Sequence, residues 1–422
     1  MTDETHQRNY ILFLIAGSGL VTVARAMTLS FLAIKLQQSF GLGPAVIGAI
    51  LGAGPLIGAL AAPFAGAVSD KVGRKAILTI TLLSMALALM GMGTAETVIS
   101  FCLAQIGGAV AVAVYEPISR AMMSDSCPSQ QRLKYFSWRY TAVNVGWAIG
   151  PLIGIAAGAA STILFLVAGA TYAVFALVLH MYKTPAARNT GTNRQPSPVS
   201  LLETVKTAAR DPRLVLFIAG GTLLISVYGQ FSATLAPYLA ENFDGGVEIF
   251  AYMMSINGLV VLIGNPFARK FIERAGALRA LIVGCLFFFV SEIGFLSAIE
   301  LWGLAVSIII FTIGEILVVP SEYMIVDGIS NERNRGSYFG AQSFSTVGNF
   351  IGPTLGGAIL GMVGGPAMFL LFAGMAAASA FLFAVGTRMP PPQVRIANGT
   401  ASSEEPSQPC SRSRLPSLAQ PA

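Results

Sequence analysis

The amino-acid sequence predicts an all-α polytopic membrane protein, and three observations support this fold class. Hydrophobic residues make up 54% of the 422 residues and charged residues only 11%, which is less than half of the share of about 25% in soluble domains. Apolar runs of roughly 20 residues recur along the chain, and each can cross about 30 Å of hydrocarbon as a helix. The runs lack the alternation of barrel strands, so helices must satisfy the backbone hydrogen bonds.

Twelve such runs can be distinguished, and the charges beside them predict the topology. Of the 26 lysines and arginines, only Lys35 lies in a connection that follows an odd-numbered run, and Arg25 lies inside the first run. This distribution matches the positive-inside rule with both termini cytoplasmic. We expect a multi-pass protein of the cell inner (plasma) membrane whose first run is retained rather than cleaved as a signal peptide. The runs begin near residues 11, 44, 75, 97, 136, 161, 214, 246, 278, 302, 337 and 366.

Composition divides the chain into two membrane bundles. A polar stretch rich in proline and basic residues separates six runs on each side, and the last stretch buries too little apolar surface to fold. We expect a cytoplasmic N-terminus over 1–10, an N-terminal six-helix bundle over 11–183, a cytoplasmic linker over 184–213, a C-terminal six-helix bundle over 214–388 and a disordered cytoplasmic tail over 389–422.

The sequence gives no indication of an enzyme. Its four cysteines are scattered without paired spacing, which predicts neither a metal site nor a disulfide framework. We find no nucleophile–base set, metal-ligand cluster or phosphate-binding loop, so we expect no cofactor and no direct use of ATP. The net charge of +6 comes from basic residues in the loops, and we therefore expect no nucleic-acid partner.

The two bundles resemble each other along one diagonal of the sequence. Residues 63–65 (PFA) recur at 266–268, Pro117 recurs as Pro320, Arg132 as Arg335 and 135–136 (YF) as 338–339, all at an offset of 203. Several matches at one offset indicate a duplication. Parallel repeats of six spans imply a pseudo-twofold axis along the membrane normal, with a cavity between the halves near the midplane.

Two motifs resemble a known family. Between the second and third runs, Gly66, Asp70, Lys71, Gly73, Arg74 and Lys75 form the pattern GxxxDKxGRK, which resembles the signature loop of the major facilitator superfamily. The stretch GWAIGPLIG at 146–154 resembles the span 5 motif of its proton-coupled antiporters, notably the 12-span drug efflux branch. The resemblance covers roughly residues 8–388. It implies the major facilitator fold, with 12 transmembrane helices in two six-helix bundles related by pseudo-twofold symmetry.

The resemblance implies a gate at the first motif. In the superfamily, the loop acid faces the N-terminus of span 11, and a loop arginine meets an acid at the inner end of span 4. Carried over, Asp70 faces span 11 and Arg74 pairs with Asp125. Such contacts would hold the inner gate shut and break when the cavity turns inward. The alternative is that Lys71, Arg74 and Lys75 only set the topology.

Glycines recur every four residues in the second motif. Four-residue spacing places them in one groove of the helix, where another helix can approach closely. A similar ladder occurs in span 11, and we interpret both ladders as a sliding seam between the halves. The alternative is ordinary small-residue packing. The motif residues are Gly146, Gly150, Pro151 and Gly154, and the span 11 glycines are Gly348, Gly352 and Gly356.

Charges inside the runs are the best candidates for the transport site, because each costs roughly 2.5–3.5 kcal/mol on insertion scales. Arg25, Glu116 and Glu315 lie in runs that, by the resemblance, line the central cavity, and Glu322 follows Glu315 by two turns. Burial disfavours an ionised carboxylate, so Glu315 or Glu116 can exchange a proton for cargo. The alternatives are structural ion pairs, Glu116 with Arg120 or Arg25 with Glu315.

Span 7 offers a further polar face, formed by Thr222, Ser226 and Gln230. Tyr228 lies nearly opposite Gln230, so both can face the cavity only if Gly229 breaks the helix. We expect Gln230 to contact the cargo, and the alternative is an interhelical hydrogen bond.

These features together predict a secondary active transporter that exports amphiphilic small molecules or drugs in exchange for protons, by alternating access. We expect a monomer whose partners are a small-molecule substrate, protons and the lipid bilayer, driven by the proton gradient. An uptake symporter for a small organic anion or nutrient is the main alternative, because Arg25 suits an anionic ligand. A membrane receptor or assembly factor without transport is a third possibility.

Overall fold

The described part of the chain is helical apart from short connections, because only helices satisfy every backbone group of a single segment within lipid. The computed structural model describes residues 3–128, 131–184, 211–330 and 335–390, without the side chains of 3–4, 59–71, 133 and 335–337. The expected linker, 184–213, and tail, 389–422, lie almost wholly outside the described residues.

The twelve expected spans are present, and three of them are interrupted. Span 1 is split between α1 and α2, span 7 between α9 and α10, and span 11 by a 3₁₀ segment, η2. Within the described residues, nine spans are long and apolar enough by composition to cross a membrane. The first half contains α1 (Asp3–Leu29), α2 (Leu32–Phe40), α3 (Pro44–Val72), α4 (Arg74–Thr94), α5 (Val98–Ser126), α6 (Arg132–Ala156) and α7 (Thr162–Met181). The second half contains α9 (Pro212–Gly229), α10 (Phe231–Asn242), α11 (Gly246–Ala275), α12 (Ala277–Ser297), α13 (Leu301–Ile329), α14 (Arg335–Gln342), η2 (Ser343–Val347), α15 (Gly348–Met362) and α16 (Gly365–Arg388).

The duplication is visible in the helix boundaries. Helices α4 and α12 are each 21 residues long and begin 203 residues apart, and α5 and α13 are each 29 residues long with the same offset. Gly73 and Gly276, which precede α4 and α12, have φ values of +98° and +86°. Only glycine adopts this region without strain, so the same turn is conserved between the two repeats.

The first helix begins earlier than the first apolar run. Helix α1 begins at Asp3 rather than near residue 11, and Tyr10 is fully buried. The ring of His6 stacks on Tyr182 at the end of α7, with the ring centroids 5.9 Å apart. Residues 3–10 therefore extend the first span and pack against the sixth.

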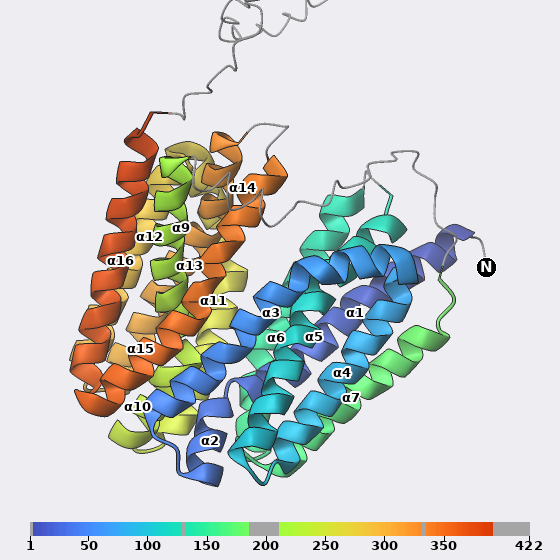
Figure 1. The fold of residues 1–422 in the computed structure, drawn as a ribbon, viewed down its shortest axis with the longest axis horizontal. Helices are drawn as coiled ribbons and strands as arrows, with labels where there is room; N and C mark the ends of the chain where they lie inside the picture. Colours follow the sequence, from blue (N-terminus) through green and yellow to red (C-terminus); the bar gives the residue numbers. More distant parts are fainter. Residues whose placement is uncertain (1–2, 129–130, 185–210, 331–334, 391–422) are drawn as a thin grey trace, which may run out of the picture.

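The two halves form a V in Figure 1, converging at the end that carries α2 and α10. We call this the far end, and we call the opposite end, where residues 184, 211 and 388 lie, the termini end. Contacts between the halves lie toward the far end: Phe31 packs on Phe250 with ring centroids 6.3 Å apart. Helix α3 also packs on α15, and α6 on α11. The structure is therefore closed at the far end, and the halves diverge at the termini end.

Candidate transport site

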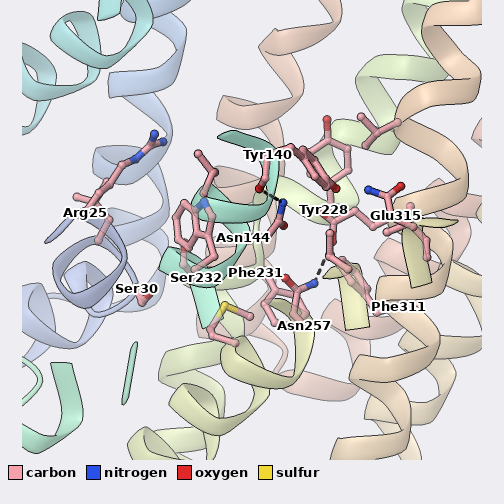
Figure 2. A pocket seen from close by; sticks show the side chains of 18 of the residues that line it. Arg25, Ser30, Tyr140, Asn144, Tyr228, Phe231, Ser232, Asn257, Phe311 and Glu315 are labelled. Atoms are coloured by element: carbon pink, nitrogen blue, oxygen red, sulfur yellow. Dashed lines mark hydrogen bonds between the residues drawn. The ribbon is translucent and has the colours of Figure 1, made fainter. Parts of the chain in front are cut away.

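A cavity of about 790 Å³ lies between the two halves. Helices α1 and α6 line it from the first half, and α9, α10, α11 and α13 line it from the second. Figure 2 shows Arg25 on one side and Glu315, Asn257 and Tyr228 on the other. Besides these groups, the cavity is lined by the amides Asn144 and Asn265. The cavity thus combines polar groups from both repeats.

Glu315 is the acidic group on the second-half wall of the cavity. It projects from α13, and one carboxylate oxygen accepts a hydrogen bond of 2.9 Å from Asn257 Nδ2 on α11. The same amide nitrogen donates to Thr312 Oγ1 at 3.0 Å. Among the described residues, no lysine, arginine or histidine forms an ion pair with Glu315. Its charge is therefore not compensated by a described basic side chain.

The first half carries a cluster of three charges, of which Arg25 lines the cavity, whereas Glu116 and Arg139 are not among its lining residues. Glu116 of α5 lies 3.1 Å from Arg139 Nη2 of α6 and 3.9 Å from Arg25 Nη1 of α1. Arg139 also donates through Nε to Ser18 Oγ at 3.2 Å. The Arg25 guanidinium lies 5.7 Å from the ring centroid of Trp147. Two arginines therefore share one carboxylate and join three helices of the first half.

Both ion pairs considered from the sequence are wrong. Arg120 donates to the backbone carbonyl of Glu116, at 3.2 Å, and not to its carboxylate. Arg25 pairs with Glu116 rather than with Glu315. The sequence does not mark Arg139 as a site residue. It lies two turns into span 5, close to the basic residues that flank this span.

The prediction for Gln230 is also wrong. Helix α9 ends at Gly229 and α10 begins at Phe231, so the helical face extrapolated from Thr222 does not continue through this point. Gln230 is only 2% exposed, and its side-chain oxygen accepts a hydrogen bond from Thr234. Tyr228 and Phe231 line the cavity instead.

Glu322 lies inside the second half and does not line the central cavity. It is 7% exposed, and one of its oxygens lies so close to α9 that a Cβ on Gly221 would be 2.5 Å from it. Pro320 lies between Glu315 and Glu322 within the continuous helix α13. Glu292 of α12 is likewise buried, and neither of its oxygens has a partner among the described residues.

The gate motif lies at the termini end of the first half. Gly66, Asp70 and Lys71 lie in the last turns of α3, and their side chains are outside the described part of the structure. The predicted contact of Asp70 with span 11 therefore stays a prediction. Gly73 forms the turn into α4 with its positive φ.

Two basic residues of the gate motif contact the first half itself. Arg74 forms an ion pair with Asp125 at the end of α5, which is the pairing that the resemblance implies. Lys75 Nζ donates to the backbone carbonyl of Tyr182 after α7, at 2.9 Å. These contacts tie α4 to its neighbours within one half.

The glycine ladders do not form a seam between the halves. Gly146, Gly150 and Gly154 pack against residues 19–27 of α1 and against Phe31, which follows it, and a Cβ on Gly150 would lie 2.5 Å from Ala26 Cβ. The span 11 ladder packs against α9 and α10 in the same way. Four-residue spacing predicted a close approach correctly, but it could not identify the partner helix.

The seam between the halves uses other glycines. Gly48 of α3 meets the backbone of Pro353 on α15, and Gly52 meets Phe350. On the other side, a Cβ on Gly258 of α11 would lie 2.8 Å from the backbone nitrogen of Ala148 on α6. Small residues therefore allow the two halves to approach closely at both of these crossings.

The fold and the cavity define a class of protein: a twelve-span membrane transporter made of two repeated halves. The family model described as Major Facilitator Superfamily matches residues 14–346 and 231–418. The chain belongs to this superfamily.

Two relatives and one solved structure show how far the similarity extends. The chain is 30% identical over 356 residues to YqjV of Bacillus subtilis, an uncharacterized MFS-type transporter, covering 83% of this chain and 86% of YqjV. It is 25% identical over 385 residues to the multidrug resistance protein MdtG of Salmonella typhi, covering 85% and 90% of the two chains. The crystal structure of the nucleoside transporter NupG has the same fold, with a TM-score of 0.78, 15% identity and coverage of 90% of this chain and 100% of NupG.

Proposed function

We propose that the protein is a proton-coupled antiporter of the inner membrane that exports amphiphilic small molecules. The observation that carries this proposal is Glu315, a carboxylate at the cavity wall with no basic partner among the described residues. An ionised carboxylate in a poorly solvated site is costly unless its charge is neutralised. Either a proton or a cationic cargo can neutralise it, but both cannot do so at once. This competition is the basis of an exchange.

The shape of the molecule and the relatives support export. With both termini cytoplasmic, as the basic residues predict, the halves diverge toward the cytoplasm, so the cavity would receive cargo from the inside. The span 5 motif resembles that of exporters, and MdtG is named as a multidrug resistance protein. We propose that the chain acts as a monomer, without a cofactor, and uses the proton gradient as its energy source.

The test uses proteoliposomes with an acidic interior and a pH-sensitive dye inside. Addition of the lipophilic cations ethidium or tetraphenylphosphonium outside should release protons from the vesicles as the cation enters in exchange. Glu315→Gln should reduce this proton release at least about 100-fold, since the amide cannot exchange a proton. Glu292→Gln is the matched control, because Glu292 is also a glutamate inside a span, is fully buried and lies outside the cavity. Normal coupling in Glu315→Gln would refute the role of this carboxylate.

Uptake of a small organic anion together with protons is the second candidate. It is favoured by the Arg25, Arg139 and Glu116 cluster, which has two positive charges and one negative charge, and by the Arg25 Nε, which has no hydrogen-bond partner among the described groups. In vesicles with the opposite pH gradient, benzoate would then enter together with protons from the acidic exterior. Proton co-entry with benzoate, combined with silence toward both cations, would favour the symporter over the exporter. Silence toward both classes of cargo would favour a receptor without transport.

A further inference from the structure

A second chamber of about 360 Å³ lies beside the central cavity. Its walls are formed by α1, α3, α4 and α5 of the first half, and it is covered by α10, η2 and α15 of the second half. Arg25, Leu29 and Ser232 line both spaces. The two spaces are therefore adjacent at these residues.

The lining of the chamber is mainly apolar. Leu51 projects from α3, Met85 and Met92 from α4, and Val112 from α5. The amide of Gln105 also reaches the chamber, where its Nε2 donates to the backbone carbonyl of Leu51 at 3.3 Å. Methionine side chains are flexible and polarizable, and they adapt to apolar groups of different shape. The chamber therefore offers an adaptable apolar surface.

The duplication places smaller residues beside the chamber in the first half. Helices α5 and α13 are repeats at an offset of 203, so Gly108 and Ala109 occupy the places of Phe311 and Thr312. In the second half, the Phe311 ring packs on Phe288 with a centroid distance of 4.6 Å. In the first half, Gly108 packs closely on α4, since a Cβ there would lie 3.1 Å from Ala88 Cβ, and the described lining of the chamber contains no aromatic ring.

The same offset relates the two most different lining residues. Val112 of α5 corresponds to Glu315 of α13, and each lines its own space. One half therefore presents a carboxylate, and the other presents an isopropyl group at the equivalent helical position. A molecule that used both would need a positively charged end and an apolar end.

We propose that the chamber binds the apolar tail of a single-tailed amphiphile whose cationic head lies in the central cavity toward Glu315. This inference rests on the proposed function and narrows its substrate class to elongated cationic amphiphiles. The Arg25 guanidinium at the junction is held by Glu116 and Trp147 on the first-half side, and the remaining positive charge of its cluster favours a cationic head at Glu315 on the opposite wall. Val112 is then a specificity-determining residue for tail length.

The test compares butyltrimethylammonium with octyltrimethylammonium in the proton-exchange vesicles. The wild-type protein should transport the octyl compound with a KM at least about tenfold lower, because the longer tail buries more apolar surface. Val112→Phe narrows the chamber and should raise the octyl KM about tenfold, while the butyl KM changes less than about twofold. Val112→Leu, which adds a single carbon, should give an intermediate value and serves where the phenylalanine variant folds poorly. Leu103→Phe is the matched control, since Leu103 lies on the same helix and is 67% exposed on the outer surface.

The outcomes separate this inference from the proposed function. Transport of both cations with the same KM, or an equal change of both KM values in Val112→Phe, would overturn the tail chamber and leave the proton exchange intact. Failure of the wild-type protein to exchange either cation for protons would overturn the proposed function, and the inference with it. A rise in the octyl KM alone in Val112→Phe, with no such rise in Leu103→Phe, would support the tail chamber.

Discussion

The two halves around the central cavity have the same backbone fold, but their acidic residues have different partners. On the first-half side, Arg25 lines the cavity, and behind it Glu116 is held by Arg139 and Arg25, so that the three charges join three helices. On the second-half wall, Glu315 has an amide hydrogen bond from Asn257 and no described basic partner. One acid is therefore part of a fixed ion-pair network, and the other is available to a mobile proton or cation.

The acids are not equivalent in the duplication. At the offset of 203, Glu116 corresponds to Val319 and Glu315 corresponds to Val112. The repeats have thus kept their helix lengths while placing their acids at different helical positions, and only Glu315 lines the central cavity. This difference assigns a structural role to the first-half acid and an exchanging role to the second-half acid, and the following predictions test that contrast.

The largest effect on stability is expected from the first-half cluster. Arg139→Met leaves Glu116 with the more distant Arg25, and the Arg139–Glu116 pair is partly buried, with side-chain exposures of 11% and 33%. Breaking such a pair from one side costs less than the roughly 3–5 kcal/mol of a fully buried pair, and we expect the free energy of unfolding to fall by about 2 kcal/mol, measured by denaturation of the purified protein in detergent. Arg269→Met is the control, because its pair with Glu273 is exposed and such pairs contribute little. Equal effects of the two substitutions would contradict the proposed structural role of the cluster.

A smaller effect on the free energy of unfolding is expected at the start of the first span of each half, where the two halves differ. Asp211 precedes α9 and accepts hydrogen bonds from Arg213 N–H at 3.0 Å and from the Tyr338 hydroxyl at 2.7 Å. Its counterpart Arg8 is exposed and lines a cavity with Tyr135, the counterpart of Tyr338. Asp211→Ala should cost up to about 2 kcal/mol through the lost cap and hydrogen bonds, whereas Arg8→Ala should cost almost nothing. A larger loss for Arg8→Ala in the same denaturation assay would reverse the contrast.

The contribution of Asp211 should depend on pH. Burial alone would raise the pKa of Asp211, but the hydrogen bonds from Arg213 and Tyr338 outweigh it and lower that pKa below its ordinary value. The stabilisation is therefore complete above the unfolded pKa of about 3.9 and is lost as the pH falls through the folded pKa. The difference in unfolding free energy between wild type and Asp211→Ala should accordingly shrink in acid.

The smallest effect concerns the glycine ladders, which the two halves share. A Cβ on Gly150 would lie 2.5 Å from Ala26 Cβ, and overpacking of this kind costs about 1–3 kcal/mol. The better helix propensity of alanine returns up to about 1 kcal/mol, so Gly150→Ala should lose about 1 kcal/mol. Gly107→Ala has open space around its Cβ and should gain stability. Destabilisation by both substitutions would argue against close packing as the cause.

Much of the fold could be predicted from the sequence. The length of a span is a property of a single segment, and the repeat offset can be read directly from the chain. The twelve spans, the two halves and the cavity between them were predicted in this way. The interruption of span 7 was harder to predict. Gly229 permitted a break, but only the packing of Phe231 and Thr234 inside the second half shows that the chain uses it.

The transport site was less predictable, because its contacts join segments far apart in the chain. Arg25, Glu116 and Glu315 stood out as charges within apolar runs, but their partners could not be read from spacing. Arg139 lies 23 residues from Glu116 in sequence, and no local pattern marks it as an internal residue. The ladders failed for the same reason, since a groove of glycines does not specify the helix that fills it.

The central claim is that the second-half acid takes up and releases the proton. Infrared difference spectroscopy of the purified protein during a pH titration detects the protonated carboxyl group directly. We expect one carboxyl band to titrate and to respond to octyltrimethylammonium. Glu315→Gln should remove this band, while Glu116→Gln should leave it in place. Loss of the band in Glu116→Gln, with its retention in Glu315→Gln, would show that Glu116 rather than Glu315 takes up the proton.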